Sequence, residues 1–351
     1  MSKEYFQAEG LTVKTIITFG LLFIIVEPSL GAIYRWDTGE LITEKDAEPG
    51  ADLSCMNLRY ADLTGAQLAG ASFFGSNLSH ARLSGADLTN AQLSFARLRE
   101  ADFSEAVISD AQFKHTTWRG FTEEQLLSTA SYQDGDLRGI RLSCNSLRGW
   151  DLSGKNLSDT DFSCLTFLCR TDLSFSDLRG AELPCCLLLC AASMEGVVFS
   201  DGTLNSLQLQ EAEDLRLWDY NGLENIPYRV ENIMSLDPDS TLKMVFEDDF
   251  WGSTIVFEPE IPVNLGGTLS LQVDKKVDPN SLVGVTFHLF DWEGVNPTGT
   301  FTVQTSPGHV WDLGELYTTG NVTLVAVPEP AMFSALLWVI LALLAGIRRS
   351  R

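Results

Sequence analysis

The chain has 351 residues, of which 47 are acidic and 24 basic, giving a formal net charge of −23. The negative charge is uneven, because residues 210–326 carry nineteen acids and only five bases. This balance argues against a protein that holds nucleic acid through a basic surface, and we expect no nucleic-acid partner.

Residues 1–32 are typical of a signal peptide. The apolar run 15–26 is too short to span a bilayer easily, and the small residues of "SLGA" (29–32) suit signal cleavage. The charged region before the run is weak, so an uncleaved anchor is the alternative. We expect residues 33–50 to cap the repeat that follows, because an open solenoid end leaves strand edges unpaired.

Residues 51–120 have a large apolar residue at every fifth position, and within residues 61–98 a small residue lies two positions before each of them. Five residues advance about 500° on an α-helix, so the apolar residues would form no stripe, and an odd period alternates faces on a flat strand. One face stays buried only if the chain turns a corner in each unit, which indicates a solenoid. The predicted core positions are Leu53, Leu58, Leu63, Leu68, Phe73, Leu78, Leu83, Leu88, Leu93, Leu98, Phe103, Ile108, Phe113 and Trp118.

"ADLTG" (61–65), "ADLTN" (86–90) and "ADFSE" (101–105) resemble the A(D/N)LXX unit of the pentapeptide-repeat family. The resemblance implies a right-handed, four-sided β-helix with 20 residues per coil. Some members of that family mimic the acidic surface of DNA and inhibit DNA gyrase. Here residues 51–120 and 135–209 carry net charges of only −1 and −3, and export would separate the chain from gyrase, so we do not expect that activity.

The repeat is interrupted at residues 121–134, where a capping box of Thr122 and Gln125 predicts one short helix. The repeat resumes over residues 135–209, with a one-residue slip after Phe167. The predicted core positions of this second block are Leu137, Leu142, Leu147, Leu152, Leu157, Phe162 and Phe167, then Leu173, Leu178, Leu183 and Leu188.

Six of the seven cysteines lie in the second block. With 20 residues per coil, Cys144, Cys164 and Cys185 are predicted on one side of the solenoid and Cys169 and Cys190 on another, and the family geometry implies that they point outward. Coils about 4.8 Å apart permit a disulfide, as does export. The odd total and the side-chain geometry of such a ladder favour free thiols, so both alternatives stay open. With no CxxC pair and no accompanying histidine, we expect no metal site.

Residues 210–326 alternate stretches rich in β-branched and aromatic residues, such as "TLKMVF" and "GTFTVQT", with Gly, Pro, Asn and Asp turns. This spacing predicts an antiparallel β-sandwich-like domain. Clustered carboxylates there are either solvated acidic loops, which we favour, or Ca²⁺ ligands. The candidate ligands are Asp237, Asp239, Asp248 and Asp249. An open face of Trp251, Trp292 and Trp311 would favour sugar binding, and burial of these rings a structural role.

Residues 327–351 combine a Pro-Glu-Pro triplet, an apolar helix over 331–347 and a basic end. Seventeen residues are the lower limit for a transmembrane helix, and the arginines after it should stay cytoplasmic. The pattern resembles the PEP-CTERM sorting signal, which implies processing by an exosortase in Gram-negative bacteria that make exopolysaccharide. An ordinary membrane anchor is the alternative. The motif residues are Pro328, Glu329, Pro330, Arg348, Arg349 and Arg351.

No GxSxG, HExxH, GxxxxGK[ST] or GxGxxG motif is present, and the four histidines are dispersed, so we expect no enzyme and no cofactor. The sequence predicts an all-β, exported protein of structural or interaction type. Its tail would tether it to the membrane until an exosortase transfers it to the cell surface or extracellular matrix. The alternative is an extracellular module that binds exopolysaccharide or a Ca²⁺-dependent partner through residues 210–326. An enzyme is a third interpretation, which a cleft joining carboxylates to a histidine would revive.

Overall fold

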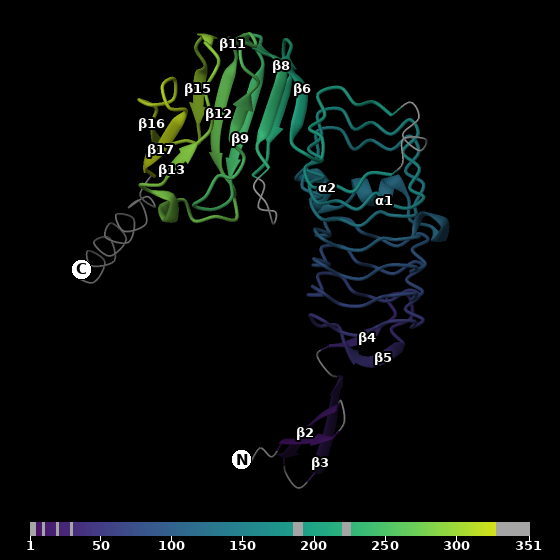
Figure 1. Cartoon of the computed structure of the whole chain (residues 1–351). Coiled ribbons are helices and arrows are strands. Elements are labelled where there is room, and N and C mark those ends of the chain that lie inside the picture. The colour runs from purple at the N-terminus through teal and green to yellow at the C-terminus, as the bar shows by residue number, and fades with distance from the viewer. Residues whose placement is uncertain are drawn as a thin grey trace, which may run out of the picture. The chain divides into compact units, whose positions relative to one another are not determined.

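The computed structural model describes residues 31–184, 192–219 and 226–327 in full, and 5–8, 11–18 and 21–28 as backbone strands. The chain divides into two compact units, Met1–Gly202 and Thr203–Arg351 (Figure 1). Strands and turns make up most of both units.

Two small antiparallel sheets begin the first unit. They contain β1 (Tyr5–Ala8), β2 (Leu11–Thr18) and β3 (Leu21–Pro28), and then β4 (Ala32–Tyr34) and β5 (Leu41–Asp46). Arg35 pairs with Ala61, and the Asp62 amide donates to the Tyr34 carbonyl. The segment around β4 and β5 therefore covers a hydrogen-bonding edge of the first coil. For the predicted signal peptide, residues 1–32, the side chains up to residue 30 lie outside the described part of the chain.

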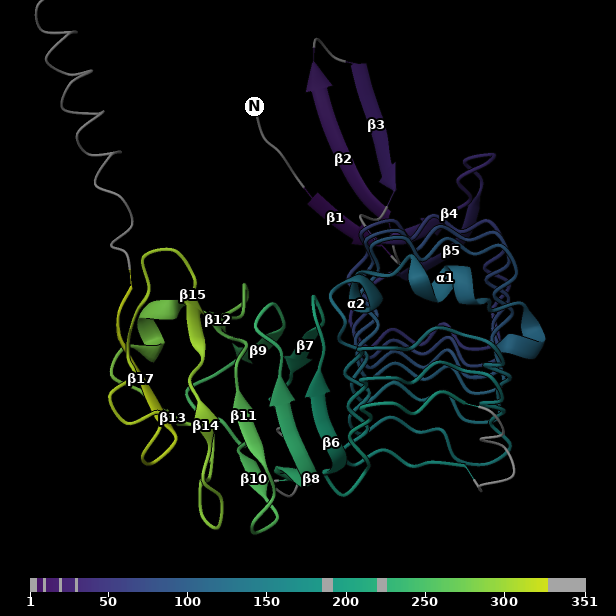
Figure 2. The same ribbon diagram turned by 90° about the horizontal axis from the view of Figure 1, so that it is seen from above.

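From residue 51 the chain coils with a period of 20 residues (Figures 1 and 2). Asp52, Ser72, Gln92 and Gln112 are joined by parallel bridges, each residue to the one a coil further on. The central side chains pack together as one continuous apolar column, which is the hydrophobic core of this unit. Side chains that are 0–2% exposed include Leu63, Leu68, Phe73, Leu78, Leu83, Leu88, Leu93 and Leu98.

Each five-residue unit ends in a corner with a left-handed backbone. The backbone angle φ is 63° at Tyr60, 65° at Gly65 and 59° at Asn90. This conformation costs an ordinary residue about 1–2 kcal/mol, which accounts for the glycines and asparagine at these corners. Asp62 and Asp102 stabilise their corners by accepting a hydrogen bond from the backbone N–H two residues further on.

Two short helices, rather than the single predicted one, interrupt the coils. The predicted capping box is present, because the Thr122 side chain accepts from the Gln125 N–H and the Gln125 side chain accepts in return. The Gln125 amide also donates to the carbonyls of Leu98 and Ala101, at 2.8 and 2.6 Å, so the insertion closes onto the coil before it. The elements of this region are the 3₁₀ turn η1 (Thr117–Arg119), α1 (Glu123–Leu127) and α2 (Ala130–Gln133).

The turn η1 corrects one predicted core position. Trp118 is 65% exposed, and Phe121, which is 2% exposed, packs in the column instead. In a regular coil the Leu98 amide would donate to the Thr117 carbonyl. Here it donates to the Arg119 carbonyl, further along the chain. The 3₁₀ turn thus lengthens this coil and turns Trp118 outward.

The coils resume after the insertion, and the one-residue slip lies earlier than predicted. Phe167 is 37% exposed, whereas Leu168 is fully buried. Arg141 pairs with Asp161, a regular coil further on, but Ser146 pairs with Phe167, one position beyond the regular step. The extra residue therefore lies between Asp161 and Phe167, in a longer corner.

Most of the other core positions predicted for the second block are confirmed. Every predicted position from Leu137 to Phe162 is fully buried, and the burial weakens toward the end of the block. The fully buried side chains are Leu137, Leu142, Leu147, Leu152, Leu157, Phe162, Leu173 and Leu178. Leu183 is partly buried against the same core, and Leu188 lies outside the described residues.

The second unit consists mainly of parallel strands, which corrects the predicted antiparallel sandwich. One sheet has the order β10-β8-β11-β14, and β6 also pairs with β8. The other sheet has the order β7-β9-β12-β15 (Figures 1 and 2). The chain crosses from the first sheet to the second after β6, β8, β11 and β14, so these strand pairs form flattened coils. The strands are β6 (Thr203–Leu209), β7 (Asp214–Leu217), β8 (Tyr228–Leu236), β9 (Thr241–Phe246), β10 (Ile255–Phe257), β11 (Val263–Leu265), β12 (Thr268–Val273), β14 (Thr298–Gly299) and β15 (Thr302–Thr305).

A long period underlies these coils, and the turn pattern of the sequence does not reveal it. Turn residues and alternating burial look the same in a hairpin and in a coil, so they cannot tell the two apart. The strand register distinguishes a coil from a hairpin. Asp214 pairs with Thr241, Thr241 with Thr268, and Thr268 with Thr302, all in parallel. The first two of these steps along the chain are equal and the third is longer, so the repeat is too long and too uneven to stand out in the sequence.

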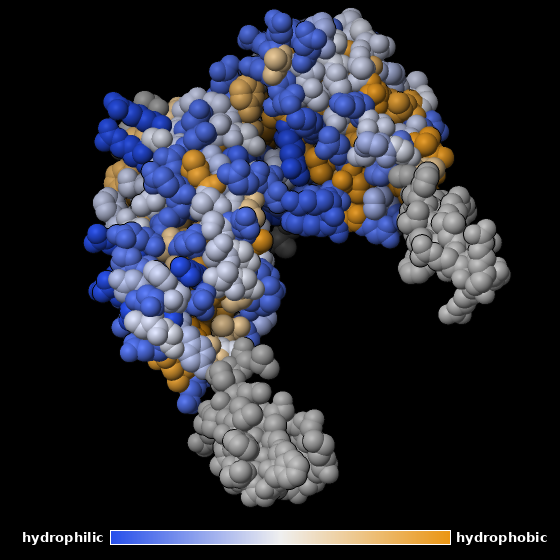
Figure 3. All heavy atoms as spheres, turned by 180° about the vertical axis from the view of Figure 1, so that it is seen from behind, coloured by the Kyte–Doolittle hydropathy of each residue, from blue (hydrophilic) through white to orange (hydrophobic). Residues whose placement is uncertain are grey.

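An antiparallel sheet ends the described chain. It has the order β13-β17-β16, and its core includes Phe246 from β9, whose ring centroid lies 4.2 Å from Phe287 and 5.0 Å from Trp311. On the face drawn in Figure 3, hydrophobic side chains gather in separate patches between hydrophilic ones. The remaining elements are η3 (Pro279–Leu282), β13 (Thr286–His288), β16 (Val310–Asp312) and β17 (Asn321–Ala326).

Candidate functional site on the first solenoid

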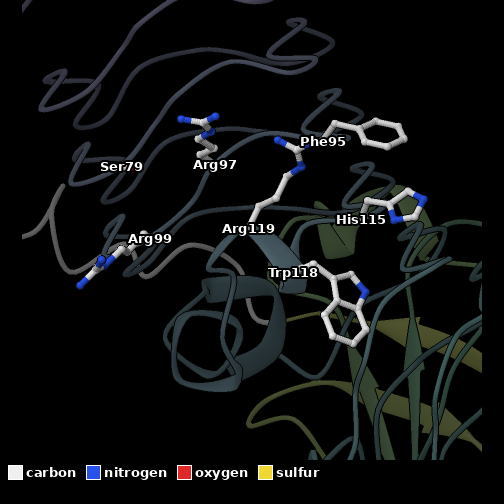
Figure 4. A pocket seen from close by; sticks show the side chains of 7 residues that line it. All are labelled: Ser79, Phe95, Arg97, Arg99, His115, Trp118 and Arg119. Carbon is white, nitrogen blue, oxygen red and sulfur yellow. The ribbon is translucent and has the colours of Figure 1, made fainter.

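A hollow of about 590 Å³ lies on one side of the first solenoid, and we name it the basic groove (Figure 4). Its volume is within the range of small-molecule sites. None of the described residues that line it is acidic. The lining residues are Ser79, Phe95, Arg97, Arg99, His115, Trp118 and Arg119.

The arginines come from two neighbouring coils. Arg97 and Arg99 flank the inward Leu98, so both point away from the core, and Arg119 ends η1 in the next coil. Arg97 and Arg119 are exposed, and neither forms an ion pair within the described part of the chain. Arg99 contacts Glu100, with 3.2 Å between Nε and Oε1, and it points away from the other two in Figure 4. The groove therefore holds two uncompensated positive charges.

Aromatic rings line the groove beside the arginines. Phe95 and His115 occupy corners one coil apart, and their ring centroids are 4.7 Å apart. Arg119 extends past this pair, with its guanidinium carbon 5.9 Å from the Phe95 centroid. Such a contact holds the cation over the negative face of the ring while leaving its N–H groups available. The result is a charged and ring-lined surface built on rigid corners.

Trp118 separates the basic groove from a second hollow of about 350 Å³. Glu123 and Glu124 of α1 line the second hollow together with Arg148. Glu123 is engaged, because its Oε1 accepts from the Asp151 amide at 2.7 Å. An anion near Trp118 is thus attracted to the Arg97 side and repelled by the carboxylates of α1.

The groove has the chemistry of a binding surface. It lacks a carboxylate to orient or activate His115, and the described residues contain no group of three metal-ligating side chains. Elsewhere, His80 lies 3.1 Å from Glu100, but its ring stacks on Tyr60 at an outward corner. Neither histidine makes the carboxylate-lined cleft that acid–base catalysis would need.

The four candidate Ca²⁺ ligands lie at opposite ends of β9. Asp237 and Asp239 precede this strand, in the short turn that leads from β8, and Asp248 and Asp249 follow it. A six-residue strand is about 20 Å long, so the two pairs do not form one site.

The three candidate rings, Trp251, Trp292 and Trp311, do not form an open stacking face. Trp251 and Trp311 are buried, at 5% and 9% exposure, and Trp292 is part-buried with its indole N–H donating to the Leu316 carbonyl. Trp292 also stacks on Phe257 and Phe290. These rings form part of the core.

The cysteines of the second block are only partly as predicted. Cys144 and Cys164 carry free thiols and lie close together; burial, followed by the Cys164 thiol, raises the pKa of Cys144. Cys169 is disulfide-bonded, and it follows the core residue Leu168 directly rather than lying two positions after a core residue, because the slip comes earlier. Cys185, Cys186 and Cys190 lie outside the described residues.

The predicted sorting motif, Pro328, Glu329, Pro330, Arg348, Arg349 and Arg351, lies outside the described residues, as does the apolar segment 331–347. Within the described ranges, no helix has the length and hydrophobicity needed to cross a bilayer.

Sequence reasoning missed the basic groove. The coil period was the one usable signal for a basic surface. Arg97 and Arg119 lie about one coil apart, and Arg99 lies close to Arg97 in the sequence, so the period brings these arginines to the same side. The decisive residue was hidden, since the five-residue phase assigns Trp118 to the core and only the 3₁₀ turn brings it to the surface.

The comparisons with known proteins identify the repeat. Residues 51–90 and 86–117 match the family model of pentapeptide repeats, with eight copies. Residues 51–117 are pentapeptide repeats. Five of the seven residues that line the basic groove lie within this segment, and Trp118 and Arg119 follow it directly.

Two solved structures resemble parts of the chain. A pentapeptide repeat protein from the thylakoid lumen of Arabidopsis thaliana is 22% identical, over 40% of this chain and 70% of its own, with a TM-score of 0.20. HetL, a pentapeptide repeat protein involved in heterocyst differentiation regulation in the cyanobacterium Nostoc sp. strain PCC 7120, is 26% identical, over 45% of this chain and 64% of its own, with a TM-score of 0.15. No curated protein matches the sequence.

Proposed function

We propose that this pentapeptide-repeat protein is an exported, non-enzymatic structural or interaction protein. The observation that supports this function is the form of the first unit, in which the central apolar side chains are buried and most corner residues are exposed or part-buried. Such a solenoid presents a rigid, extended surface. Its basic groove offers charge and rings for binding but no catalytic pair.

The tail supports a temporary membrane tether. A helix over 331–347 would stop in the bilayer with its final arginines in the cytoplasm, because arginines are costly to move across. Pro328 and Pro330 disfavour a helix that continues outward, which would leave an extended backbone for an exosortase-type enzyme. Cleavage there would move the protein to the cell surface or extracellular matrix.

The test of this function is the mature form of the protein. Cells of a host that has an exosortase are fractionated, and the termini of the protein are measured by mass spectrometry. We expect a chain that lacks the signal segment and ends near residue 330, found outside the cell or on its surface. The variant Pro328→Ala/Pro330→Ala should stay membrane-bound and uncleaved, whereas Pro307→Ala, at an exposed turn, should be processed normally. Wild-type protein that keeps Arg351 at steady state would leave the tail as an ordinary anchor.

The alternative function, polysaccharide or Ca²⁺-dependent binding through the second unit, has weaker support than its sequence suggested. The rings that would stack on sugars are buried or part-buried, and the four aspartates are split between the ends of β9. The observation that favours a binding function lies in the first unit, at the basic groove.

A further inference from the structure

We propose that the basic groove binds an acidic oligosaccharide, with Arg97 and Arg119 holding a sugar carboxylate and Trp118 packing against the sugar ring. This inference deepens the proposed function. It rests on the proposed export only for the place where the protein would meet its ligand, outside the cell. The binding itself depends on residues 79–119 alone.

The two arginines supply the anion site. Their guanidinium groups have no carboxylate partner within the described chain, although acids outnumber bases almost two to one in the sequence. A guanidinium presents parallel N–H donors that match the two oxygens of a carboxylate. Since the Phe95 ring lies near Arg119, this side chain is held partly in position before a ligand arrives.

The aromatic side chains supply the second half of the recognition. Trp118 is 65% exposed, although indole is among the side chains that gain most from burial. The flat, C–H-rich face of a sugar ring packs on the negative face of such an aromatic ring. Trp118 and the guanidinium groups line the same hollow, so one oligosaccharide can contact both.

The sparse charge of the groove selects among polyanions. Nucleic acid carries a phosphate at every nucleotide, and binding it needs a long run of basic residues. Here two uncompensated arginines belong to a chain of net charge −23, and Glu123 and Glu124 lie beyond Trp118. A uronate-containing oligosaccharide meets this arrangement better, because its remaining surface is hydroxyl groups and ring faces that acidic neighbours do not repel.

The test measures binding of the purified full-length protein in detergent to oligogalacturonate by isothermal titration calorimetry. Neutral dextran and a single-stranded DNA oligonucleotide serve as competing ligand classes. We expect oligogalacturonate to bind and Arg97→Ala/Arg119→Ala to bind at least ~10-fold more weakly. Trp118→Ala should also weaken binding, while Trp118→Phe retains most of it. Arg141→Ala removes an exposed arginine outside the groove and should bind like wild type.

Each other outcome counts against the inference. It is overturned if wild-type protein does not bind oligogalacturonate, if the double arginine variant binds as wild type does, or if dextran binds equally well. Preferential binding of the DNA would reassign the groove to nucleic acid. Circular dichroism melts check that the variants are folded. Because binding is measured on purified protein, its failure leaves the export proposal intact, and uncleaved protein in cells leaves the binding result intact.

Discussion

Side chains in the apolar column of the first solenoid tolerate charge poorly because no water reaches them. Leu93 is fully buried, whereas its neighbour Gln92 is exposed. Leu93→Asp loses about 2–5 kcal/mol of packing and adds a buried carboxylate that costs several kcal/mol more. We expect a large fall in melting temperature by circular dichroism and almost none for Gln92→Asp. Equal effects of the two variants would contradict the inward column.

Corner glycines differ in what lies beside them. Gly65 and Gly139 both have φ of +65°, so adding a side chain strains both backbones by about 1–2 kcal/mol. A Cβ at Gly65 would meet no atom within 4 Å, whereas one at Gly139 would collide with the Asp110 carboxylate. Gly139→Ala should therefore unfold at lower urea concentration than Gly65→Ala. Combining Gly139→Ala with Asp110→Gly should remove the difference, and persistence of the full difference would exclude the collision as its cause.

Asp110 itself should make stability depend on pH. Burial is the main cause that raises the pKa of this carboxyl above its ordinary 3.8. A raised folded-state pKa means that the ionised form is disfavoured in the native state, so stability falls as pH rises from below 3.8. Asp110→Asn should therefore melt higher than wild type at pH 7, and the gain should vanish near pH 3. Glu105→Gln, at an exposed corner, is the control and should show no such gain.

Among the elements, the helical insertion depends on one side chain more than on its cap. The Gln125 side chain donates to two coil carbonyls and accepts from the Thr122 backbone N–H, whereas the Thr122 hydroxyl accepts one long backbone contact of 3.5 Å and contacts the exposed Glu124 carboxylate. Gln125→Ala removes the donor to the Ala101 carbonyl, while the Leu98 carbonyl still accepts from the Ala101 backbone N–H, and should cost about 1–3 kcal/mol. Thr122→Ala should cost about 0.5–1 kcal/mol. Urea unfolding measures both, and a larger loss for Thr122→Ala would contradict this assignment.

The elements also separate what the sequence could predict from what it could not. A period of five is compatible with few backbones, so the core positions from Leu53 to Phe113 follow from the sequence alone. Strand alternation in the second unit is compatible with hairpins and coils alike, so its parallel pairing required the register between Thr241 and Thr268. Local departures such as η1 depend on competing turn geometries, and therefore Trp118 and the groove beside it were missed.

For the whole molecule, the two solenoid-like units differ in charge. Residues 203–327 carry nineteen acids and five bases, and residues 31–202 carry 24 acids and 14 bases. The second unit has the larger net charge in the shorter segment, so like-charge repulsion opposes its folding more strongly. Salt screens such repulsion over distances of about 10 Å at 0.1 M. The stability of the second unit should therefore respond more strongly to ionic strength.

The full chain should unfold in two separable steps. Each unit has its own buried residues, so Leu93→Asp should lower only one calorimetric transition and Leu269→Asp only the other. Raising the salt concentration should increase the melting temperature of the second unit, the transition that Leu269→Asp affects, more than that of the first unit. Gln92→Asp, at an exposed position, should leave both in place. A single transition that both leucine variants lower would mean that the units fold as one cooperative body, because two independent cores cannot share one melting event.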